Sequence, residues 1–504
     1  MLFNSPAFIF AFLPLVLLGF FACARFGQRL ALAWLTAASL VFYALHDPGA
    51  LPVLLLSMAF NLLAARALAG VSQPGARQGP AKALLVLAIA ANLAWLLHFK
   101  YAAFISTWWQ GIAAPPGLAD IPLGISFFTF TQVAFLVDVA RRRSADLDPL
   151  RYALFVTYYP HLVAGPILHH SQTMPQFQRS DVFRFSPDRL ADGSVLFILG
   201  LFKKVVLADQ FASYADPAFQ AAASGHAPTF FEAWGAALSY TLQIYFDFSG
   251  YCDMAIGLAA MIGVQLPMNF NAPYKARNLV EFWRRWHITL SSFLRDYLYI
   301  PLGGSRRGPL RRHANLMLTM LLGGLWHGAG WTFVAWGGLH GAGLVACHLW
   351  QAGTARARLA GAGRALPAWL RPAPRLVAGA LTFTFVVLAW VLFRAADLPA
   401  AGLMLAGMAG IHGSLLPEQW FTLAPWLTSL AEPVGKVPWL ADGSVMGAVE
   451  MLVMLTGGLA VVWWAPTLPQ LSQRWRYGLV LPCAALALQR VLYGPPSPFL
   501  YFQF

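Results

Sequence analysis

Charged residues are scarce in this chain of 504 residues. Asp, Glu, Lys and Arg make up 11% of it, against the roughly 25% usual in soluble domains, while hydrophobic residues make up 59% and the mean hydropathy is +0.60. Apolar runs long enough to cross a bilayer recur, among them SPAFIFAFLPLVLLGFFACA, AKALLVLAIAANLAWLLHF and RLVAGALTFTFVVLAWVLF. The sequence therefore predicts an all-α integral membrane protein with about eleven to thirteen helices.

Acidic residues and cysteines are scarcer still, with 20 Asp and Glu and four Cys. The cysteines lie far apart in apolar surroundings, with no C-x-x-C or Cys/His spacing, so we expect no metal and no prosthetic group. The chain also lacks a G-x-x-x-x-G-K-[ST] phosphate loop, an H-E-x-x-H motif and a G-x-S-x-G motif. Hydrolytic and ATP-driven chemistry therefore have no support.

Basic residues outnumber acidic ones, and the formal net charge is +14. They stand in short clusters between apolar runs rather than on one soluble face, which argues against a nucleic acid partner. The positive-inside bias predicts that these clusters mark the cytoplasmic loops of a multi-pass protein. The clusters are Arg25 with Arg29, Arg66 with Arg77 and Lys82, Arg141 to Arg143, Lys203 with Lys204, Arg306 to Arg312, and Arg356 to Arg364.

No polar stretch exceeds the size of a loop, so we expect one integral-membrane domain over residues 1–504. Residues 1–100 and 375–495 give clean hydrophobic spans. Between residues 120 and 345, the catalytic core of this interpretation, the apolar segments are broken by proline, glycine and charge. Irregular backbone survives at membrane depth only where protein or a water-filled cavity satisfies its polar groups. We therefore expect a cavity in this middle region.

The segment GGLWHGAGW, residues 323–331, places His327 after an apolar run. Ionisable residues at membrane depth are costly when charged and by default mark a functional path. Imidazole can stay neutral there because its unperturbed pKa is near 6.5, and a neutral imidazole can accept a proton from a hydroxyl or thiol. The glycines allow helices or a substrate chain to approach closely. The alternative is a structural histidine bonded to a neighbouring helix.

The segment EFWRRWHITLSSFLRDYLYIPLGG, residues 281–304, contains a second histidine, His287. Placed on one helix, its basic and polar residues line one edge and its aromatic residues another. Guanidinium groups match phosphate oxygens, so Arg284, Arg285 and Arg295 could bind the phosphates of coenzyme A or of a lipid headgroup. The alternative is that these arginines hold anionic lipid or pair with the two carboxylates of the same segment.

Two further segments carry weaker signals. Residues 240–257, YTLQIYFDFSGYCDMAIG, contain Asp247 and Asp253, which we expect to pair with the arginines just named. Residues 158–170, YYPHLVAGPILHH, contain His161, which could line the same cavity or shape a turn.

Taken together, these segments resemble the membrane-bound O-acyltransferase (MBOAT) family, specifically its bacterial branch similar to alginate O-acetylation membrane proteins. The matching stretches follow the family order and cover most of the chain. They are PLGISFFTFTQVAFLVDVARR, YYPHLVAGPI, GLFKKVVLAD, YFDFSGYCDMAIGLAAMIG, NFNAPYKARNLVEFWRRWHITLSSFLRDYLYIPLGG, GGLWHGAGWTFVAWGGLHG, FVVLAWVLFRA and SPFLYFQF. The resemblance implies tilted and re-entrant helices around a central funnel that leads to a membrane-embedded histidine.

The resemblance also implies the chemistry. His327 in GLWHG corresponds to the catalytic histidine and His287 in RRWHITLS to the second family histidine. Cytoplasmic acetyl-CoA would supply the acetyl group, and His327 would either activate the acceptor hydroxyl as a base or accept the acyl group itself. The predicted cofactor-binding residues are Arg284, Arg285, Arg295 and Trp326.

The resemblance implies a protein of the bacterial inner membrane that serves the O-acetylation of an exported polysaccharide, such as alginate, cellulose or peptidoglycan. Relatives usually hand the acetyl group to a periplasmic or membrane-anchored SGNH-type protein with a Ser-His-Asp site. This chain lacks such a serine motif, so a separate partner fits, in addition to membrane lipids. The alternative function is a polysaccharide or lipid transporter or flippase without acyl transfer. A transporter predicts an internal repeat, whereas here the rare residues gather around two histidines.

Overall fold

The computed structural model describes residues 1–72, 78–110, 121–141, 146–359, 373–435, 437–438, 440, 445–495 and 497–500. Helices dominate these residues, and the strands among them form one short parallel pair. The predicted all-α membrane class is confirmed. Four described helices are long and apolar enough to cross a membrane, and the larger predicted number of spans stays a prediction. They are Leu51–Val71, Gly79–Thr107, Pro374–Arg394 and Met446–Trp464.

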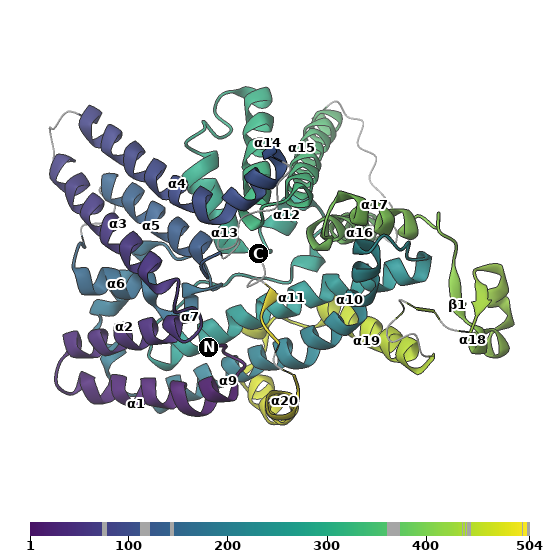
Figure 1. Ribbon diagram of the computed structural model, residues 1–504, viewed down its shortest axis with the longest axis horizontal. Helices are drawn as coiled ribbons and strands as arrows, with labels where there is room; N and C mark the ends of the chain where they lie inside the picture. Colours follow the sequence, from purple (N-terminus) through teal and green to yellow (C-terminus); the bar gives the residue numbers. More distant parts are fainter. Residues whose placement is uncertain are drawn as a thin grey trace. The chain divides into compact units, whose positions relative to one another are not determined.

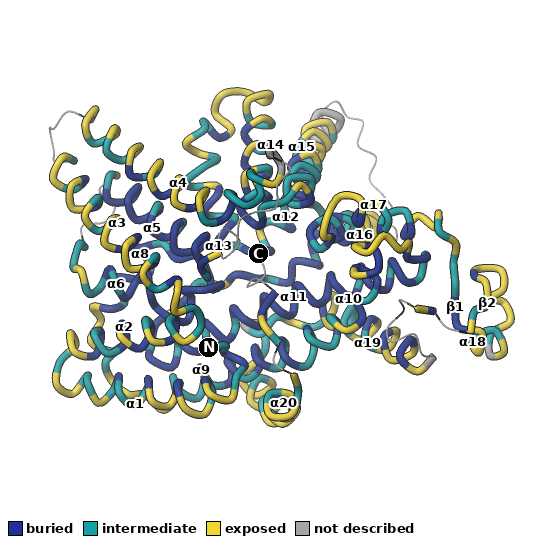
Figure 2. The backbone as a smooth tube through the Cα atoms, viewed as in Figure 1, coloured by how far each residue is buried: buried dark blue, intermediate teal, exposed yellow. Residues whose placement is uncertain are grey.

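The described contacts divide the chain into two compact units, and the prediction of one domain stays a prediction. The first unit comprises Met1–Val206, Phe248–Met268 and Ser472–Phe504, and the second comprises Leu207–Asp247 and Asn269–Leu471. Helix α11 (Phe230–Met261) begins in the second unit and ends in the first. Most of its residues are buried (Figure 2).

The first unit carries several long helices and several short helical turns (Figure 1). Helices α1 and α2 lie side by side, and α5 packs against α3 and α4. Its α-helices are α1 (Leu13–Ala24), α2 (Gln28–Ala44), α3 (Leu51–Val71), α4 (Gln78–Gln110), α5 (Ile125–Ala140), α6 (Pro149–Thr157), α7 (Tyr159–Leu162), α8 (His170–Thr173), α9 (Pro187–Phe202) and α20 (Gln473–Tyr493). Its other turns are the π-helix η1 (Phe8–Phe12) and the 3₁₀-helices η2 (Met174–Gln178) and η3 (Ser180–Phe183), and the π-helix η4 (Lys203–Ala208) leads into the second unit.

The second unit contains the segments with the candidate histidines. Its α-helices are α10 (Asp209–Ala223), α12 (Leu279–Trp283), α13 (Ile288–Leu294), α14 (Gly308–His327), α15 (Trp331–Leu359), α16 (Ala373–Arg394), α17 (Leu398–Met408), α18 (Glu418–Leu423) and α19 (Val445–Trp464). Its other turns are η5 (Pro273–Lys275), η6 (Arg295–Tyr299), η8 (Pro425–Ser429) and η9 (Leu468–Gln470). Strands β1 (Leu415–Pro417) and β2 (Glu432–Val434) pair in parallel, with Leu415 opposite Glu432.

The division into clean ends and an irregular middle stays a prediction, although the four candidate spans lie toward the two ends of the chain. All four candidate spans begin and end within or next to the two terminal regions that the sequence predicts to be regular. The middle region instead contains short helices and turns such as α7, α8, α12 and α13. Proline stands in the first turn of α6, α7 and α9 and marks where each of these helices starts. The first turn has no intrahelical acceptor for its N–H groups, so the missing N–H of proline costs nothing there.

Polar side chains inside the spanning helices satisfy one another, because hydrocarbon offers no hydrogen-bonding partner. The side-chain amides of Asn61 on α3 and Asn92 on α4 form two hydrogen bonds with each other, at 2.9 and 2.8 Å. On α5, Gln132 donates to the Ser57 hydroxyl of α3 and accepts from the Tyr152 hydroxyl of α6, at 2.9 and 2.8 Å. These bonds hold the helices of the first unit in register.

Two sequence predictions in the first unit are wrong. Lys203 and Lys204 lie in the π-helix η4 rather than in a cytoplasmic loop. Lys203 Nζ lies 2.5 Å from Asp253 Oδ2, so Asp253 pairs with this lysine and not with the arginines of residues 281–304. Lys204 is buried and donates to the Pro498 carbonyl at 2.9 Å. A buried ammonium needs such acceptors, which a count of charges along the sequence does not reveal.

Other predicted loop clusters reach beyond the described chain. Arg77, Arg142 and Arg143 lie outside the described residues, as does the end of the cluster from Arg356 to Arg364. Arg306 and Arg307 are exposed in the turn before α14, which agrees with a loop.

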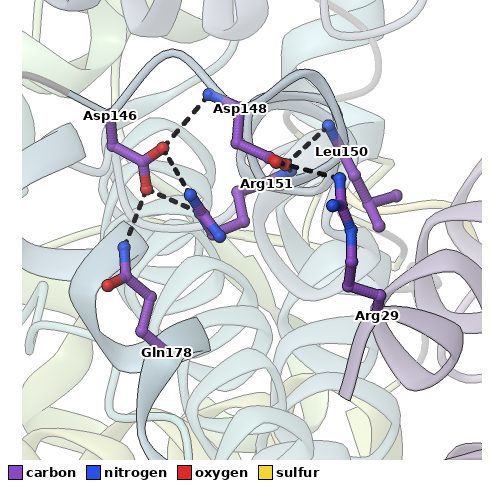
Figure 3. A network of polar contacts seen from close by, with 6 residues as sticks. All are labelled: Arg29, Asp146, Asp148, Leu150, Arg151 and Gln178. Carbon is purple, nitrogen blue, oxygen red and sulfur yellow. Dashed lines mark hydrogen bonds and ion pairs between the residues drawn. The ribbon is translucent and has the colours of Figure 1, made fainter. Parts of the chain in front are cut away.

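A network of polar contacts surrounds Asp146 and Asp148 at the start of α6 (Figure 3). Asp148 caps α6 by accepting from the backbone N–H groups of Leu150 and Arg151, both at 3.0 Å. The Arg151 guanidinium reaches Asp146 with two bonds of 2.6 and 2.9 Å, and Gln178 donates to the same carboxylate at 2.8 Å. Burial alone would raise the pKa of Asp146, but these donors outweigh it and hold the pKa below its ordinary value.

Replacing Asp146 with Asn should lower the free energy of unfolding near neutral pH by about 1 kcal/mol. Because the folded-state pKa of this carboxyl is depressed, its stabilising effect is present above the unfolded pKa of about 4 and is lost as the pH falls below it. Thermal unfolding of purified Asp146→Asn and Asp188→Asn, the latter changing an exposed carboxylate of α9, would measure this. A deficit in Asp146→Asn that persisted below about pH 3 would contradict the assignment.

Candidate active site

Helices α14 and α15 form a hairpin, and His327 is the last residue of α14 (Figure 1). The helix ends there because the backbone of Gly328 is extended. Glycines bring the two helices into contact. A methyl group added at Gly324 would overlap the carbonyl oxygen of Phe333, and one added at Gly337 would overlap that of Met320. The predicted close approach of helices at these glycines is confirmed.

Replacing Gly324 with Ala should lower the free energy of unfolding by about 2 kcal/mol or more, because the added methyl group must push α14 away from α15. Gly353, on α15 of the same hairpin, is the matched control, because it has open space around it. There the same substitution should stabilise the helix by about 0.5–1 kcal/mol. Thermal unfolding in detergent would compare the two variants. Equal stability would show that α14 and α15 do not depend on this contact.

The His327 ring is enclosed by aromatic side chains. Its ring centre lies 4.9 Å from that of Trp326, 5.3 Å from that of Trp336 on α15 and 5.2 Å from that of Phe393 on α16. Trp336 and Phe393 meet the imidazole edge to face. His327 is only 4% exposed. Three helices therefore fix the orientation of a buried imidazole.

The segment with His287 is not the single helix that the sequence predicts. Helix α12 ends at Trp283 and α13 begins at Ile288, and His287 between them has a left-handed backbone with φ of 44°. Such a conformation costs about 1–3 kcal/mol in a residue with a side chain. Tertiary hydrogen bonds impose it. The Asn271 N–H donates to the Arg285 carbonyl at 2.9 Å, and the Ile288 N–H donates to the Asn269 carbonyl at 3.0 Å.

The left-handed turn brings the second histidine to the first. The ring centres of His287 and His327 are 6.4 Å apart, and that of Trp326 is also 6.4 Å from His287. His287 is completely buried. Side chains forty residues apart in the sequence thus meet inside the second unit.

The three predicted arginines lie in different surroundings. Arg285 pairs with Glu281 at 2.8 Å, and Arg295 is bound to Asp296 by two bonds of 2.7 and 2.9 Å. Pairing with the carboxylates of the same segment, the alternative to phosphate binding, is therefore present for both. For the side chain of Arg284, the described part of the chain shows no hydrogen bond and no ion pair, and its backbone N–H donates to the Val280 carbonyl at 3.3 Å.

Arg284 and Arg285 line an open polar cavity of about 550 Å³. The residues around it are Asn271, Asn278, Val280, Glu281, Arg284, Arg285 and Gln351. His287, His327, Trp326 and Arg295 are not among them. The predicted site residues therefore fall into a buried group around the two histidines, a cavity with two arginines, and Arg295, which lies at the surface.

His161 in the first unit shapes a turn, which is one of the two roles that the sequence leaves open. Its Nε2 lies 2.8 Å from the Phe155 carbonyl oxygen, and the ring is buried next to Tyr158. A carbonyl oxygen only accepts, so Nε2 carries the proton.

Several residues around the histidines were not expected. They are Asn269, Trp336 and Phe393, and His340 gave only a weak signal in the sequence. His340 is completely buried, with its ring 4.8 Å from that of Trp336. The asparagine stands in MNFNAPY, where a buried polar residue next to aromatics was the one available signal. No group of three or more His, Cys, Asp or Glu that could hold a metal occurs within the described residues.

Sequence comparison decides the family of this site. Residues 85–371, which include both histidines, match MBOAT, the membrane-bound O-acyltransferase family. The chain belongs to this family. It is therefore an acyltransferase, and the structure described above is that of a membrane-bound O-acyltransferase.

The named relatives of this acyltransferase are named for acyl transfer to peptidoglycan, alginate or teichoic acid. It is 42% identical to the peptidoglycan O-acetyltransferase of Helicobacter pylori, over 82% of this chain and 80% of that protein. It is 39% identical to the probable alginate O-acetylase AlgI of Pseudomonas putida over the full length of both. It is 29% identical to the teichoic acid D-alanyltransferase of Streptococcus thermophilus, over 45% of this chain and 57% of that protein.

Proposed function

We propose that this acyltransferase takes acetyl groups from cytoplasmic acetyl-CoA and passes them across the membrane for O-acetylation of an exported polysaccharide. The observation that carries the proposal is the meeting of two buried histidines from separate segments, with ring centres 6.4 Å apart. The relatives named as O-acetyltransferases of alginate and peptidoglycan support acetyl as the acyl group and a polysaccharide as the final acceptor.

His327 is the proposed catalytic base. A hydroxyl oxygen attacks the carbonyl carbon of the thioester, and its proton passes to the imidazole of His327. The carbon–sulfur bond breaks as the new ester bond forms, and the thiolate that leaves takes up a proton. In a covalent variant of this path, the imidazole nitrogen itself first takes the acetyl group. His287 is the proposed second proton-transfer group, because its buried ring lies with its centre 6.4 Å from that of His327.

The polar cavity of Arg284 and Arg285 is the proposed site for the phosphates of coenzyme A. The guanidinium fork fits phosphate oxygens, and Arg284 faces the cavity without a carboxylate partner in the described chain. Arg295 adds positive charge at the surface near the same segment. Trp326, with its ring 4.9 Å from that of His327, is proposed to pack against the acyl end of the donor.

A separate protein completes the proposed pathway. The sequence has no serine nucleophile motif, so transfer onto the polymer needs an SGNH-type acetyltransferase in the periplasm or anchored in the membrane. The proposed location of the enzyme is the inner membrane of a bacterium. The proposed final acceptor is alginate, cellulose or peptidoglycan, and the named relatives favour alginate or peptidoglycan.

The proposal is tested with purified protein in lipid vesicles and acetyl-CoA labelled in the acetyl group. We expect release of free CoA, and transfer of label to short alginate or peptidoglycan fragments once an SGNH-type partner is added. Butyryl-CoA serves as a comparison for the acyl group. Labelled acetyl-CoA that is neither hydrolysed nor transferred, with or without partner and acceptor, would overturn the proposal.

A further inference from the structure

Asn269 lies on a short extended segment that pairs with the turn carrying His287. Its backbone carbonyl accepts from Ile288 at 3.0 Å, and two residues later Asn271 donates to Arg285 at 2.9 Å. Asn269 is completely buried, as His287 is. The segment from Asn269 to Asn271 is therefore bonded to the chain on both sides of the left-handed residue.

The side-chain oxygen of Asn269 meets three groups. Asn269 Oδ1 accepts from the backbone N–H of Thr289 at 3.1 Å and from the Thr289 hydroxyl at 3.0 Å. The same oxygen lies 3.2 Å from Nδ1 of His287. A backbone N–H can only donate, so the amide atom that faces it is the oxygen and not the nitrogen. The orientation of the amide follows from this one contact.

The orientation of the amide decides the protonation of the imidazole. An amide oxygen can only accept, so the ring nitrogen beside it, Nδ1 of His287, carries the proton. In a neutral imidazole the other nitrogen then holds the lone pair. Nε2 is thus the basic nitrogen of His287.

We propose that Asn269 is a positioning residue that holds His287 in the tautomer with the proton on Nδ1, so that Nε2 exchanges protons with substrate groups. The inference rests on the proposed catalytic role of His287. It extends that role by naming the reacting atom and the residue that selects it. The same asparagine also holds the strained backbone of His287 through its carbonyl, so the direction and the tautomer of the ring depend on one residue.

Three variants separate the possible roles of this residue. Asn269→Leu has a similar size but no acceptor, so it removes the bond to Nδ1. Asn269→Asp keeps an oxygen at the same position and should restore the tautomer. Thr289→Val is the matched control, because it removes one donor from the same oxygen and leaves the bond to His287 intact.

The direct readout is the ¹⁵N spectrum of histidine-labelled protein at a pH where histidines are neutral. The signals of His287 are those missing from His287→Gln. We expect Nδ1 to be protonated in the wild type, in Asn269→Asp and in Thr289→Val, and both tautomers to appear in Asn269→Leu. A proton on Nε2 of wild-type His287, or an unchanged spectrum in Asn269→Leu, would overturn the inference. The wild-type result needs no variant of Asn269 to fold, only His287→Gln for the assignment of the signals.

The second readout is acetyl transfer. In Asn269→Leu, kcat should fall by about 10²–10⁴-fold with KM for acetyl-CoA nearly unchanged, as expected when a proton-transfer histidine has the wrong tautomer. Recovery in Asn269→Asp would support the inference, and equal losses in Asn269→Asp and Asn269→Leu would oppose it. Full activity of His287→Gln would instead refute the proposed role of His287, whatever the spectrum shows, so the two failures can be told apart.

Discussion

Replacing His327 with Gln should abolish acetyl transfer, with a fall in kcat of about 10³-fold or more. The amide has a similar size and keeps a polar group, but it cannot take up the proton of an acceptor hydroxyl. The aromatic rings of Trp336 and Phe393 hold the side chain in place, so we expect the fold to persist. Release of CoA from acetyl-CoA by purified protein in lipid vesicles would measure the loss.

The matched control for this prediction is His313→Gln, on the same helix. His313 lies in the second turn of α14 and is half-buried, whereas His327 at the end of the helix is buried. Activity should stay near that of the wild type in His313→Gln, and thermal unfolding should be similar in both variants. Normal turnover by His327→Gln would remove this residue from the mechanism even though the family assignment stands.

The double substitution Arg284→Ala with Arg285→Ala should raise the KM for acetyl-CoA by about 10–100-fold. A hydrogen bond to a charged group contributes about 1.5–3 kcal/mol, and both guanidinium groups line the same cavity. The effect on kcat should be small, because the cavity is lined by neither histidine. Steady-state kinetics at several salt concentrations would separate the two parameters.

Glu281→Gln provides a test of opposite sign. Glu281 lines the same cavity and pairs with Arg285, so it opposes a phosphate there and occupies one of the arginines. In the wild type, the Glu281 carboxylate accepts a hydrogen bond from the backbone N–H of Arg277 at 3.0 Å, and glutamine keeps an oxygen for this bond. KM should fall in Glu281→Gln. Arg295→Ala should have a smaller effect than the double variant, since its guanidinium is 60% exposed and bound to Asp296. Unchanged KM in the double variant would move the donor site elsewhere.

Much of the site could be predicted from the sequence, because membrane proteins make rare residues informative. A histidine between glycines after an apolar run stands out at position 327, and the structure confirms the close helix packing expected there. The sequence also singles out the segment around His287, but the single helix that it predicts there is wrong, because α12 and α13 are separate helices. Propensity along a chain cannot show that Asn269 and Asn271 would form hydrogen bonds with residues 285 and 288 and break the helix.

The partners of charged residues were the least predictable. Asp253 of α11 pairs with Lys203 of η4, and two of the three arginines bind carboxylates one or four positions away. Charge type predicts that a buried carboxylate needs a cation, but not which one. That choice depends on which helix faces lie against each other.

The sequence by itself determined the solvent in which this protein works, its helical class, its family and the two histidines, because each of these follows from local composition or from residues in a fixed order. Only the tertiary structure decided that His287 adopts a left-handed backbone, that its ring centre lies 6.4 Å from that of His327, and that its Nδ1 lies beside the side-chain oxygen of Asn269. These features depend on hydrogen bonds and ring contacts between segments far apart in the chain. The energy of such contacts exceeds the local preference of a few residues for a helix.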